Sequence, residues 1–421
     1  MTNRSLNSEA IAKAHASFPV VGIGASAGGI EACSTLLREL PKDGGIAYVV
    51  IQHLGANSPS MLSQILARET DLSVAEAKHN AVVEPNRVYV IPPNIRMTIA
   101  QGRLQLAPRE VSDRPFKSID IFFKSLAADC RSHAIGVVLS GLDGDGAEGL
   151  RRIKETGGVT FAQTENSAEF SSMPITAAET GQVDFILPPA EIARQIVKIA
   201  QHPYISEPDG FQLSSASETD SKTDSKTDSE SSLTSLYSLL KVSTGVDFSQ
   251  YKRATFERRL KRRMALYRIS SLETYIKHLK NSPVELDALY HDVLIKVTSF
   301  FRDAETFDFL KQVIFPALIE QKGLDDSVRI WVAGCATGEE CYSLAISLFE
   351  FLSEQNLNLS IQIFGTDVDE AVVDVARRGI YPESRMEGVS AERRSRFFVH
   401  ADGHYQISKA VRELCVFARQ N

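Results

Sequence analysis

Three segments of this chain place a hydroxyl, an imidazole and a carboxylate directly after apolar runs or among glycines. Ser26 lies in the small-residue loop that ends Val20–Gly29, and His53 directly follows an apolar run. Asp145 lies in the glycine-rich segment Ser140–Gly146. In acyl transfer a serine attacks the carbonyl carbon, a histidine takes and returns the proton, and a carboxylate orients the imidazole. The three residues therefore predict a hydrolytic site.

Each residue also has a plainer interpretation. Ser26 is equally consistent with a helix N-cap or with the phosphate-binding glycine loop of a nucleotide fold. His53 alone is consistent with an imidazole whose partners are backbone groups. Asp143 and Asp145 are consistent with turn formation, because Asp-Gly pairs favour tight turns. The shared position of three such groups after apolar runs favours the catalytic interpretation.

The elements that must position these residues alternate between strand and helix patterns up to about Ala200. Strands are predicted at Val20–Gly24, Ile46–Ile51, Arg87–Ile91, Ala134–Leu139, Val159–Ala162 and Val183–Leu187. Helices are predicted at Ile30–Leu40, Ser60–Glu69, Ile119–Asp129 and Ala147–Thr156. Continuous apolar strands alternating with helices predict an α/β fold with a doubly wound parallel sheet. In such a fold the ligand site lies at the carboxyl ends of the strands, which is where all three residues fall.

Composition narrows the class of protein. The chain has 421 residues, 43% of them hydrophobic and 24% charged, which predicts a soluble globular protein of two or three domains. The net charge of −7 gives no support to nucleic-acid binding. Five cysteines without metal-ligand spacing predict reduced cytoplasmic thiols and no metal site. The chain lacks a run of about 18 apolar residues, so direct membrane insertion is not expected.

The first half resembles the chemotaxis protein-glutamate methylesterase family (CheB type). The matching segments are Gly24–Gly29, Ile51–His53, Val88–Pro93, Arg114–Asp120 and Ser140–Ala147. The resemblance covers residues 18–200 and implies that Ser26 is the nucleophile, His53 the base and Asp145 the orienting acid. It does not place the triad acid at Asp143. It implies hydrolysis of glutamate γ-methyl esters, and also glutamine deamidation, on the cytoplasmic helices of receptors.

The segments on either side of this domain lack the strand and helix patterns of a folded domain. Residues 1–17 are predicted to be an N-terminal lead-in, too short for the receiver domain common in the family, so control by phosphorylation in cis is not expected. Residues 206–232, with a Ser/Thr/Asp/Lys repeat, are predicted to be a flexible linker.

Residues 233–295 read as a small helical domain. Helices are predicted at Leu233–Thr244, Phe256–Tyr267, Leu272–Lys280 and Glu285–Ile295. The basic run Arg258–Arg263 lies in the second of these helices. It is consistent with docking on acidic receptor helices and equally with a solvated basic helix face.

Residues 296–421 contain the pattern of a second candidate site, one that could bind a cofactor. Strand Val328–Ala333 is followed by a turn from Gly334 to Gly338 and by a helical run, and a second strand ends in Asp367. Strand, glycine turn and helix form the cofactor corner of a Rossmann-like unit, in which a carboxylate after the next strand accepts hydrogen bonds from ribose hydroxyls. A nicotinamide cofactor is disfavoured because Gly-x-Gly-x-x-Gly is missing.

This half resembles the chemotaxis receptor glutamate methyltransferase family (CheR type), which uses S-adenosylmethionine. The segments that carry the likeness are Thr298–Arg302, Ala333–Glu340, Tyr342–Ala345, Thr366–Asp369 and Ala376–Tyr381. The resemblance implies that the cofactor contacts Thr298, Arg302, Glu339 and Asp367, beside the turn at Gly334. Lys296 and Cys341 replace the family's usual asparagine and proline. The last third of the family's sheet, which would follow Asn421, is missing, so a truncated and inactive transferase is expected.

The sequence therefore predicts a methylesterase fused to a truncated methyltransferase, two activities that remove and add the same methyl group. The expected partners are methyl-accepting chemotaxis-type receptors, and the expected location is the cytoplasm. Two alternatives stay open: a serine hydrolase with another ester substrate, and a non-catalytic adaptor that binds receptor helices through the basic run.

Overall fold

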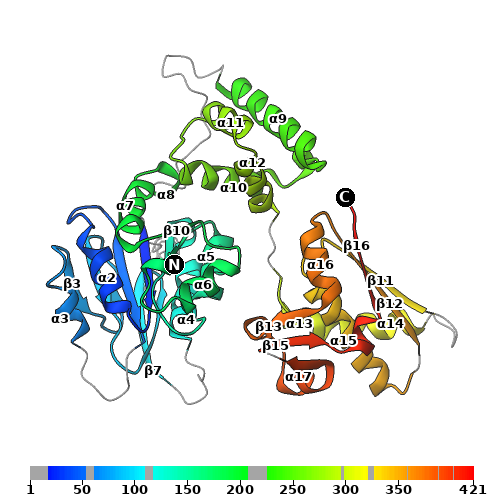
Figure 1. The fold of residues 1–421 in the computed structure, drawn as a ribbon. Coiled ribbons are helices and arrows are strands. Elements are labelled where there is room, and N and C mark those ends of the chain that lie inside the picture. The colour runs from blue at the N-terminus through cyan, green and yellow to red at the C-terminus, as the bar shows by residue number, and fades with distance from the viewer. Residues whose placement is uncertain are drawn as a thin grey trace, which may run out of the picture. The chain divides into compact units, whose positions relative to one another are not determined.

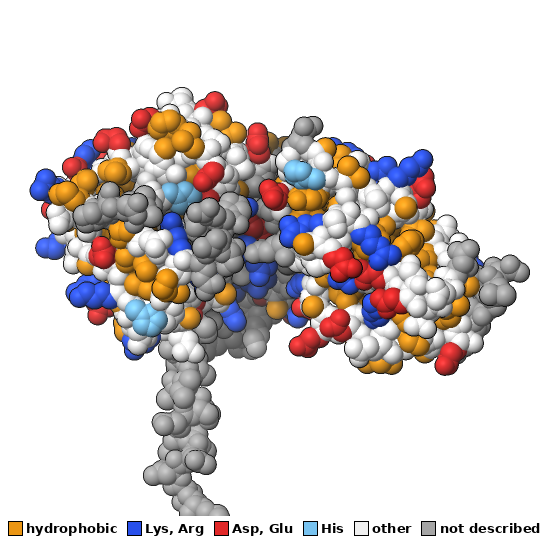
Figure 2. Space-filling model, turned by 90° about the horizontal axis from the view of Figure 1, so that it is seen from below, with side chains coloured by type: hydrophobic (Ala, Val, Ile, Leu, Met, Phe, Trp, Pro, Cys, Tyr) orange, Lys and Arg blue, Asp and Glu red, His pale blue; other side chains and the backbone are white. Residues whose placement is uncertain are grey.

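The computed structural model describes residues 18–53, 61–109, 117–206, 225–294, 298–320, 327–357, 359–386, 388–401 and 403–421. The chain forms two compact units, the first Met1–Leu240 with Asp247–Val293 and the second Lys241–Val246 with Leu294–Asn421 (Figure 1). No helix in these ranges combines the length and the apolar character needed to cross a bilayer. Acidic and basic side chains are interspersed over the face shown in Figure 2.

A seven-stranded sheet forms the centre of the first unit, and every pairing in it is parallel. Its strands, in spatial order, are β10 (Phe185–Leu187), β9 (Val159–Gln163), β8 (Ala134–Val138), β1 (Val20–Ala25), β2 (Ala47–Gln52), β5 (Arg87–Val90) and β3 (Ser73–Glu76). The predicted parallel sheet and its six predicted strands are confirmed. The edge strand β3 was not predicted, because its sequence Ser-Val-Ala-Glu has no continuous apolar run.

Helices cover both faces of this sheet (Figure 1). They are α2 (Gly29–Arg38), α3 (Leu62–Leu66), α4 (Ser118–Cys130), α5 (Ala147–Thr156), α6 (Ser172–Glu179), α7 (Pro189–Ala200) and α8 (Pro203–Ser206). One core lies between the sheet and α2 and α7, and the other between the sheet and α4 and α5. Gly22 and Gly24 allow α4 to lie directly on β1, since a Cβ built on Gly24 would be 2.3 Å from Ile119.

A three-stranded antiparallel sheet, which was not predicted, lies beside α4. Its strands are β4 (Ala81–Val82), β7 (Arg103–Pro108) and β6 (Ile95–Ala100). The carboxylate of Asp129 in the last turn of α4 accepts hydrogen bonds from the backbone N–H groups of Gln101 and Gly102, at 2.6 and 2.9 Å. This contact holds the β6–β7 turn on the helix.

The helical segment contains the four predicted helices, with different limits. They are α9 (Ser225–Thr244), α10 (Arg253–Leu266), α11 (Leu272–Asn281) and α12 (Pro283–Val293). Helix α9 begins inside the predicted flexible linker, so the linker prediction is wrong for residues 225–232. Just beyond this stretch, the hydroxyls of Thr234 and Ser235 donate to the carbonyls of Glu230 and Ser231 one turn back, at 2.9 and 3.0 Å. The rest of the predicted linker, 207–224, lies outside the described residues.

The basic run is built into the first unit, which contradicts the expectation of a solvated or receptor-binding helix face for most of its arginines. Arg262 is fully buried, donates to the carbonyl of Gly158 at 2.8 Å and forms ion pairs with Asp184 and Asp292. Arg259 donates to two carbonyls in the last turn of α5, each at 2.7 Å, where the helix dipole favours a cation. Sequence periodicity could not show this, because the acceptors lie about 100 residues away along the chain.

The second unit also has a parallel sheet, in the order β11 (Ser327–Ala333), β12 (Ser360–Asp367) and β16 (Cys415–Arg419). Its other elements are α13 (Ala304–Phe309), α14 (Phe315–Glu320), α15 (Glu339–Glu354), α16 (Glu370–Arg378), β13 (Ile380–Pro382), α17 (Ala391–Phe397), β14 (Phe398–Ala401), β15 (His404–Ile407) and α18 (Lys409–Arg412). A π-helical turn, Leu310–Ile314, separates α13 from α14. Pro316 accounts for it, because proline has no N–H for a regular helical bond.

The buried arginine gives a test of the contact between α10 and the sheet. Arg262→Met keeps an apolar stem but leaves Asp184 buried without its guanidinium partner. We expect the free energy of unfolding of the first unit to fall by about 3 kcal/mol or more, since breaking a buried ion pair costs about 3–5 kcal/mol. Urea denaturation followed by circular dichroism measures the change. Arg258→Met, at an exposed position of the same helix, is the matched control, and equal midpoints for the two variants would contradict the expectation.

Candidate active site

Strand register brings Ser26 and His53 to the same level of the sheet. β1 and β2 are parallel with Ala25 opposite Gln52, and the N–H of His53 donates to the carbonyl of Ala25 at 3.1 Å. Ser26 and His53 are therefore the first residues beyond two neighbouring strands, which lie about 4.8 Å apart. On the other side of β1, the N–H of Ser26 donates to the carbonyl of Ser140 at 2.9 Å.

The loop of Ser26 is held tightly from behind. The side-chain amide of Gln52 donates to the Ser26 carbonyl, and Ser140 Oγ donates to the Ala27 carbonyl at 2.8 Å. Gly28 has φ +70°, and a Cβ there would lie 2.7 Å from Ser140 Oγ. Helix α2 begins at Gly29, so its N-terminus lies behind the serine as predicted. The Ser26 hydroxyl makes no hydrogen bond to another residue in the described part of the chain.

The structure brings His53 and Asp145 into direct contact. His53 Nε2 is 2.8 Å from Asp145 Oδ2, and the Asp145 side chain is only 2% exposed. If Asp145 is ionised, Nε2 carries the proton of the neutral imidazole, and Nδ1 is the nitrogen that remains to act as a base. A second carboxylate, that of Asp143, lies 3.4 Å from Nδ1.

The carboxylates of Asp145 and Asp120 cap the starts of two helices, α4 and α5. The Asp145 carboxylate accepts from the N–H groups of Ile119 and Asp120 in the first turn of α4, both at 2.9 Å. The Asp120 carboxylate accepts from the N–H groups of Gly146 and Gly149 at the start of α5, at 3.0 and 2.7 Å. Each helix thus has its N-terminus satisfied by an acid of the other, which fixes the position of Asp145 relative to His53.

The pKa values of two residues at this site, Asp120 and His53, are shifted from their usual range. Burial raises the pKa of Asp120 to about 7, with a further rise from the charge of Asp145, against the hydrogen bond from Gly149. Burial lowers the pKa of His53, but the hydrogen bond and charge of Asp145 and the charge of Asp143 outweigh it, so the pKa lies above its usual value. The charge of Arg109 acts in the lowering direction.

Two residues near the site were not assigned a role from the sequence. Asp120 belongs to the segment Arg114–Asp120, but its spacing from Asp145 gave no sign of their shared helix caps. Arg109 follows β7 and donates to Ser118 Oγ at 2.9 Å, at the start of α4. The position of Asp120 in the first turn of a predicted helix could have indicated its role in capping a helix. No signal was available for Arg109, because it depends on an antiparallel sheet that was not predicted.

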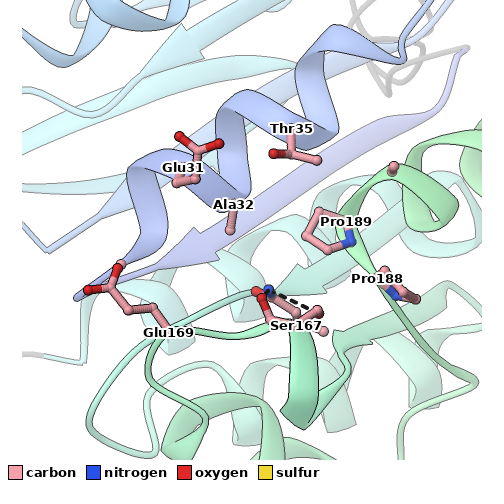
Figure 3. A pocket seen from close by; sticks show the side chains of 10 residues that line it. Glu31, Ala32, Thr35, Ser167, Glu169, Pro188 and Pro189 are labelled. Atoms are coloured by element: carbon pink, nitrogen blue, oxygen red, sulfur yellow. Dashed lines mark hydrogen bonds between the residues drawn. The ribbon is translucent and has the colours of Figure 1, made fainter.

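A cavity of about 300 Å³ lies beside the Ser26 loop, toward β9 and β10 (Figure 3). Ala32 and Thr35 face it from α2, and Pro188 and Pro189 face it from the start of α7. Its lining residues are Gly28, Glu31, Ala32, Thr35, Gln163, Ser167, Glu169, Pro188, Pro189 and Ala190. Gly28 is the one lining residue from the loop of the candidate nucleophile, and Ser26, His53 and Asp145 do not line the cavity.

The second predicted site forms around the turn after β11. The N–H groups of Gly334 and Cys335 donate to the Thr366 carbonyl at 2.8 and 2.9 Å. The Asp367 carboxylate accepts from the N–H of Ala336 at 2.9 Å and from that of Asp369 at 3.0 Å. Gly334 and Asp367 are thus brought together, as predicted.

This turn leaves room for a bound group. Gly334 has φ +71°, and a Cβ built on it meets no atom within 4 Å. A carboxylate has about four lone-pair positions, and Asp367 uses two of them on backbone N–H groups, which leaves capacity for ribose hydroxyls. The residues at the turn therefore fit the adenosine part of S-adenosylmethionine.

The remaining predicted cofactor residues lie around the start of α15. Glu339 is fully buried, and its oxygens are engaged by Thr337 at 2.5 Å and by Arg385 at 2.8 Å. The segment of Thr298 and Arg302 is fixed to α15 through the N–H of Phe301, which donates to Ser343 Oγ at 3.0 Å. Glu339 therefore supports the turn from inside, whereas the side chain of Arg302 is more than half exposed, at 56%.

Fold and site together define a chain of two α/β units, one with a parallel sheet edge that carries Ser26, His53 and Asp145, the other with a glycine turn before a helix. The chain belongs to the CheB methylesterase family, whose model matches residues 21–196. Residues 232–294 match the model described as CheR methyltransferase, all-alpha domain, and residues 296–421 match CheR methyltransferase, SAM binding domain. The fusion expected from the sequence is confirmed.

Known relatives cover one or both halves. An uncharacterised 104.1 kDa protein of Rhodobacter capsulatus is 33% identical over 372 residues, which are 86% of this chain and 39% of that protein. A Leptospira interrogans protein, named as a candidate protein-glutamate methylesterase/protein-glutamine glutaminase, is 35% identical over 44% of this chain and 96% of its own length. Protein-glutamate methylesterase/protein-glutamine glutaminase 2 of Anaeromyxobacter dehalogenans is 38% identical over 43% of this chain and 53% of its own length.

One solved structure is also similar. The crystal structure of the Thermotoga maritima CheB methylesterase catalytic domain aligns with 43% of this chain and 98% of that chain, at 26% identity and a TM-score of 0.40. The chain spans less than half of the length of its Rhodobacter relative.

The raised pKa of Asp120 predicts a pH-dependent contribution to stability. Its pKa rises from 3.8 to about 7 on folding, so folding takes up a proton, and stability falls as the pH rises through this window. Asp120→Asn keeps an acceptor oxygen for α5 but has no charge to bury. We expect the variant's free energy of unfolding, relative to the wild type, to rise by at least about 1 kcal/mol between pH 4.5 and pH 8.

Urea denaturation at the two pH values measures this difference. Asp71→Asn, which removes an exposed carboxylate, is the control for a general change of charge. A difference between Asp120→Asn and wild type that stays constant with pH would contradict the expectation.

Proposed function

We propose that the first unit hydrolyses γ-methyl esters of glutamate on the cytoplasmic helices of chemotaxis-type receptors, and that it also deamidates glutamine there. The observation that carries the proposal is the His53–Asp145 contact at the strand end next to Ser26, in a chain of the CheB methylesterase family. This substrate places the protein in the cytoplasm.

The proposed reaction uses Ser26 as nucleophile and His53 as general base. The Ser26 oxygen attacks the ester carbonyl carbon while His53 Nδ1 accepts the hydroxyl proton, and the imidazolium then gives that proton to the departing methanol. Water repeats the steps and releases glutamate and free Ser26. Asp145 stabilises the imidazolium through its contact with Nε2.

The surroundings of Ser26 support the proposed substrate. The N-terminus of α2 behind the loop favours the negative charge that develops on the carbonyl oxygen. The cavity beside Gly28 gives room for a side chain that flanks the ester on the receptor helix. The adaptor alternative loses support, because Arg259, Arg262 and Arg263 of the basic run are buried in contacts within the unit.

For the second unit we propose binding of S-adenosylmethionine at the turn after β11. Asp367 would hold the ribose hydroxyls, the open space at Gly334 would admit the nucleoside, and Thr298 and Arg302 would approach from the segment fixed to α15. The bound cofactor supplies the methyl group for glutamate esterification. The buried Glu339 would support this site by holding Thr337 and Arg385 in place.

Removing the candidate nucleophile tests the esterase. Ser26→Ala should lower kcat for methanol release from a receptor-helix peptide bearing a glutamate γ-methyl ester by at least about a thousandfold, because loss of a catalytic serine removes the covalent pathway. Ser63→Ala, in the short helix α3, is the matched control and should keep the wild-type rate. Equal rates for Ser26→Ala and wild type would refute the assignment of the nucleophile.

Calorimetric titration of S-adenosylhomocysteine into the full chain tests the cofactor turn. We expect binding that is weakened at least about tenfold in Asp367→Ala, because two hydrogen bonds to a charged acceptor are lost. Asp374→Ala, on the exposed face of α16, is the control. The fluorescence of Trp331, the single tryptophan, gives a second readout, since its indole N–H donates to Thr366 Oγ1 at 2.9 Å. Titration without heat or fluorescence change would refute the proposal.

A further inference from the structure

His53 has a carboxylate on each of its two ring nitrogens, and only one of them belongs to the triad proposed above. Asp145 Oδ2 is 2.8 Å from Nε2, and Asp143 Oδ2 is 3.4 Å from Nδ1. The position of Asp143 is fixed by its other oxygen, which accepts from the N–H of Asp145 at 3.1 Å. The two acids lie two residues apart in one loop and reach opposite edges of the ring.

This arrangement matters because Nδ1 is the nitrogen that must accept the proton of Ser26. When Nδ1 is unprotonated, its lone pair faces the negative charge of Asp143, which is repulsive. When Nδ1 is protonated, both ring N–H groups face carboxylates, which is the favourable arrangement for an imidazolium. Asp143 therefore favours the charged histidine, which cannot act as a base until it releases a proton to water.

Asp143 is one of several charged groups that change the pKa of His53. Asp145 contributes most, and Arg109 opposes both acids from the chain after β7. Asp120 lies behind Asp145, where it caps α5. The Asp143 side chain is 54% exposed against 2% for Asp145, so water screens its charge and its effect is the smaller one.

We propose that Asp143 is a positioning residue for the His53 imidazole, which it holds by an ion pair at Nδ1, and that it raises the pH above which the esterase becomes active. The inference rests on the esterase reaction proposed above and concerns how that site is regulated. The same ion pair stabilises the imidazolium that forms during the attack by Ser26. Asp143 thus raises the rate at high pH and lowers the fraction of active enzyme at low pH.

The test compares wild type with Asp143→Asn, which has the same shape and keeps an oxygen for the N–H of Asp145. The first measurement is an NMR titration of the His53 ring, which requires no turnover. The second is the pH dependence of kcat/KM for methanol release from the methyl-ester peptide. Asp43→Asn, which removes an exposed carboxylate before β2, is the matched control.

In Asp143→Asn, both the His53 titration midpoint and the acid limb of the pH profile should move down by about 0.5–1 pH unit, the size of a partly screened charge effect. The rate at high pH should fall about two- to fivefold, because a less basic imidazole is the weaker catalyst. Asp43→Asn should show neither change. An unchanged or raised midpoint in Asp143→Asn would overturn the inference, whereas a wild type without Ser26-dependent turnover would overturn the esterase and leave the NMR result to decide the ion pair.

Discussion

The exchange of helix caps between Asp120 and Asp145 is the constraint on which the first site depends. Two helices begin at the same edge of the sheet, and each would otherwise leave N–H groups unsatisfied in a buried region. Because each acid comes from the other helix or its loop, α4 and α5 cannot shift independently. Asp145 Oδ2 both accepts from α4 and faces His53, so the contact that stabilises the fold also orients the His53 ring. Gly22 and Gly24 of β1 complete the arrangement by letting α4 approach the sheet closely.

The helical segment is attached at the other end of the same sheet, where the strands begin. Gly158 and Asp184, which bind Arg262, directly precede β9 and β10, whereas Ser26, His53 and Asp145 follow strand ends. The charge of Arg262 holds the pKa of Asp184 well below its usual range despite complete burial. An ion pair of this kind fixes geometry more than it adds stability, because both charges lose hydration. The helical segment therefore packs at the amino ends of β9 and β10, at the end of the sheet opposite Ser26, His53 and Asp145.

The sequence was most informative where a local pattern is sufficient. Apolar strands alternating with helices predicted the parallel sheet, and residues following those strands predicted Ser26, His53 and Asp145 as neighbours. Prediction failed where the cause is a distant partner. The arginines of α10 are indistinguishable from a solvated basic face until Asp184 and the α5 carbonyls are known to lie against them. The polar edge strand β3 was missed because its pairing with β5 outweighs the local preference of its residues. The early start of α9 was missed because serine and threonine are weak helix formers in sequence terms.

Burial separates the roles of acids that are chemically identical. Asp145 is buried and bonded to backbone N–H groups, so it presents a fixed charge to His53, while the exposed Asp143 presents a screened one to the other nitrogen. The second unit uses the same device: Asp367, at the end of β12, holds the neighbouring turn through the N–H of Ala336. The same turn contains the open space at Gly334. In both units a carboxylate beyond a parallel strand is thus held by backbone N–H groups, beside an imidazole in the first unit and at an open glycine turn in the second.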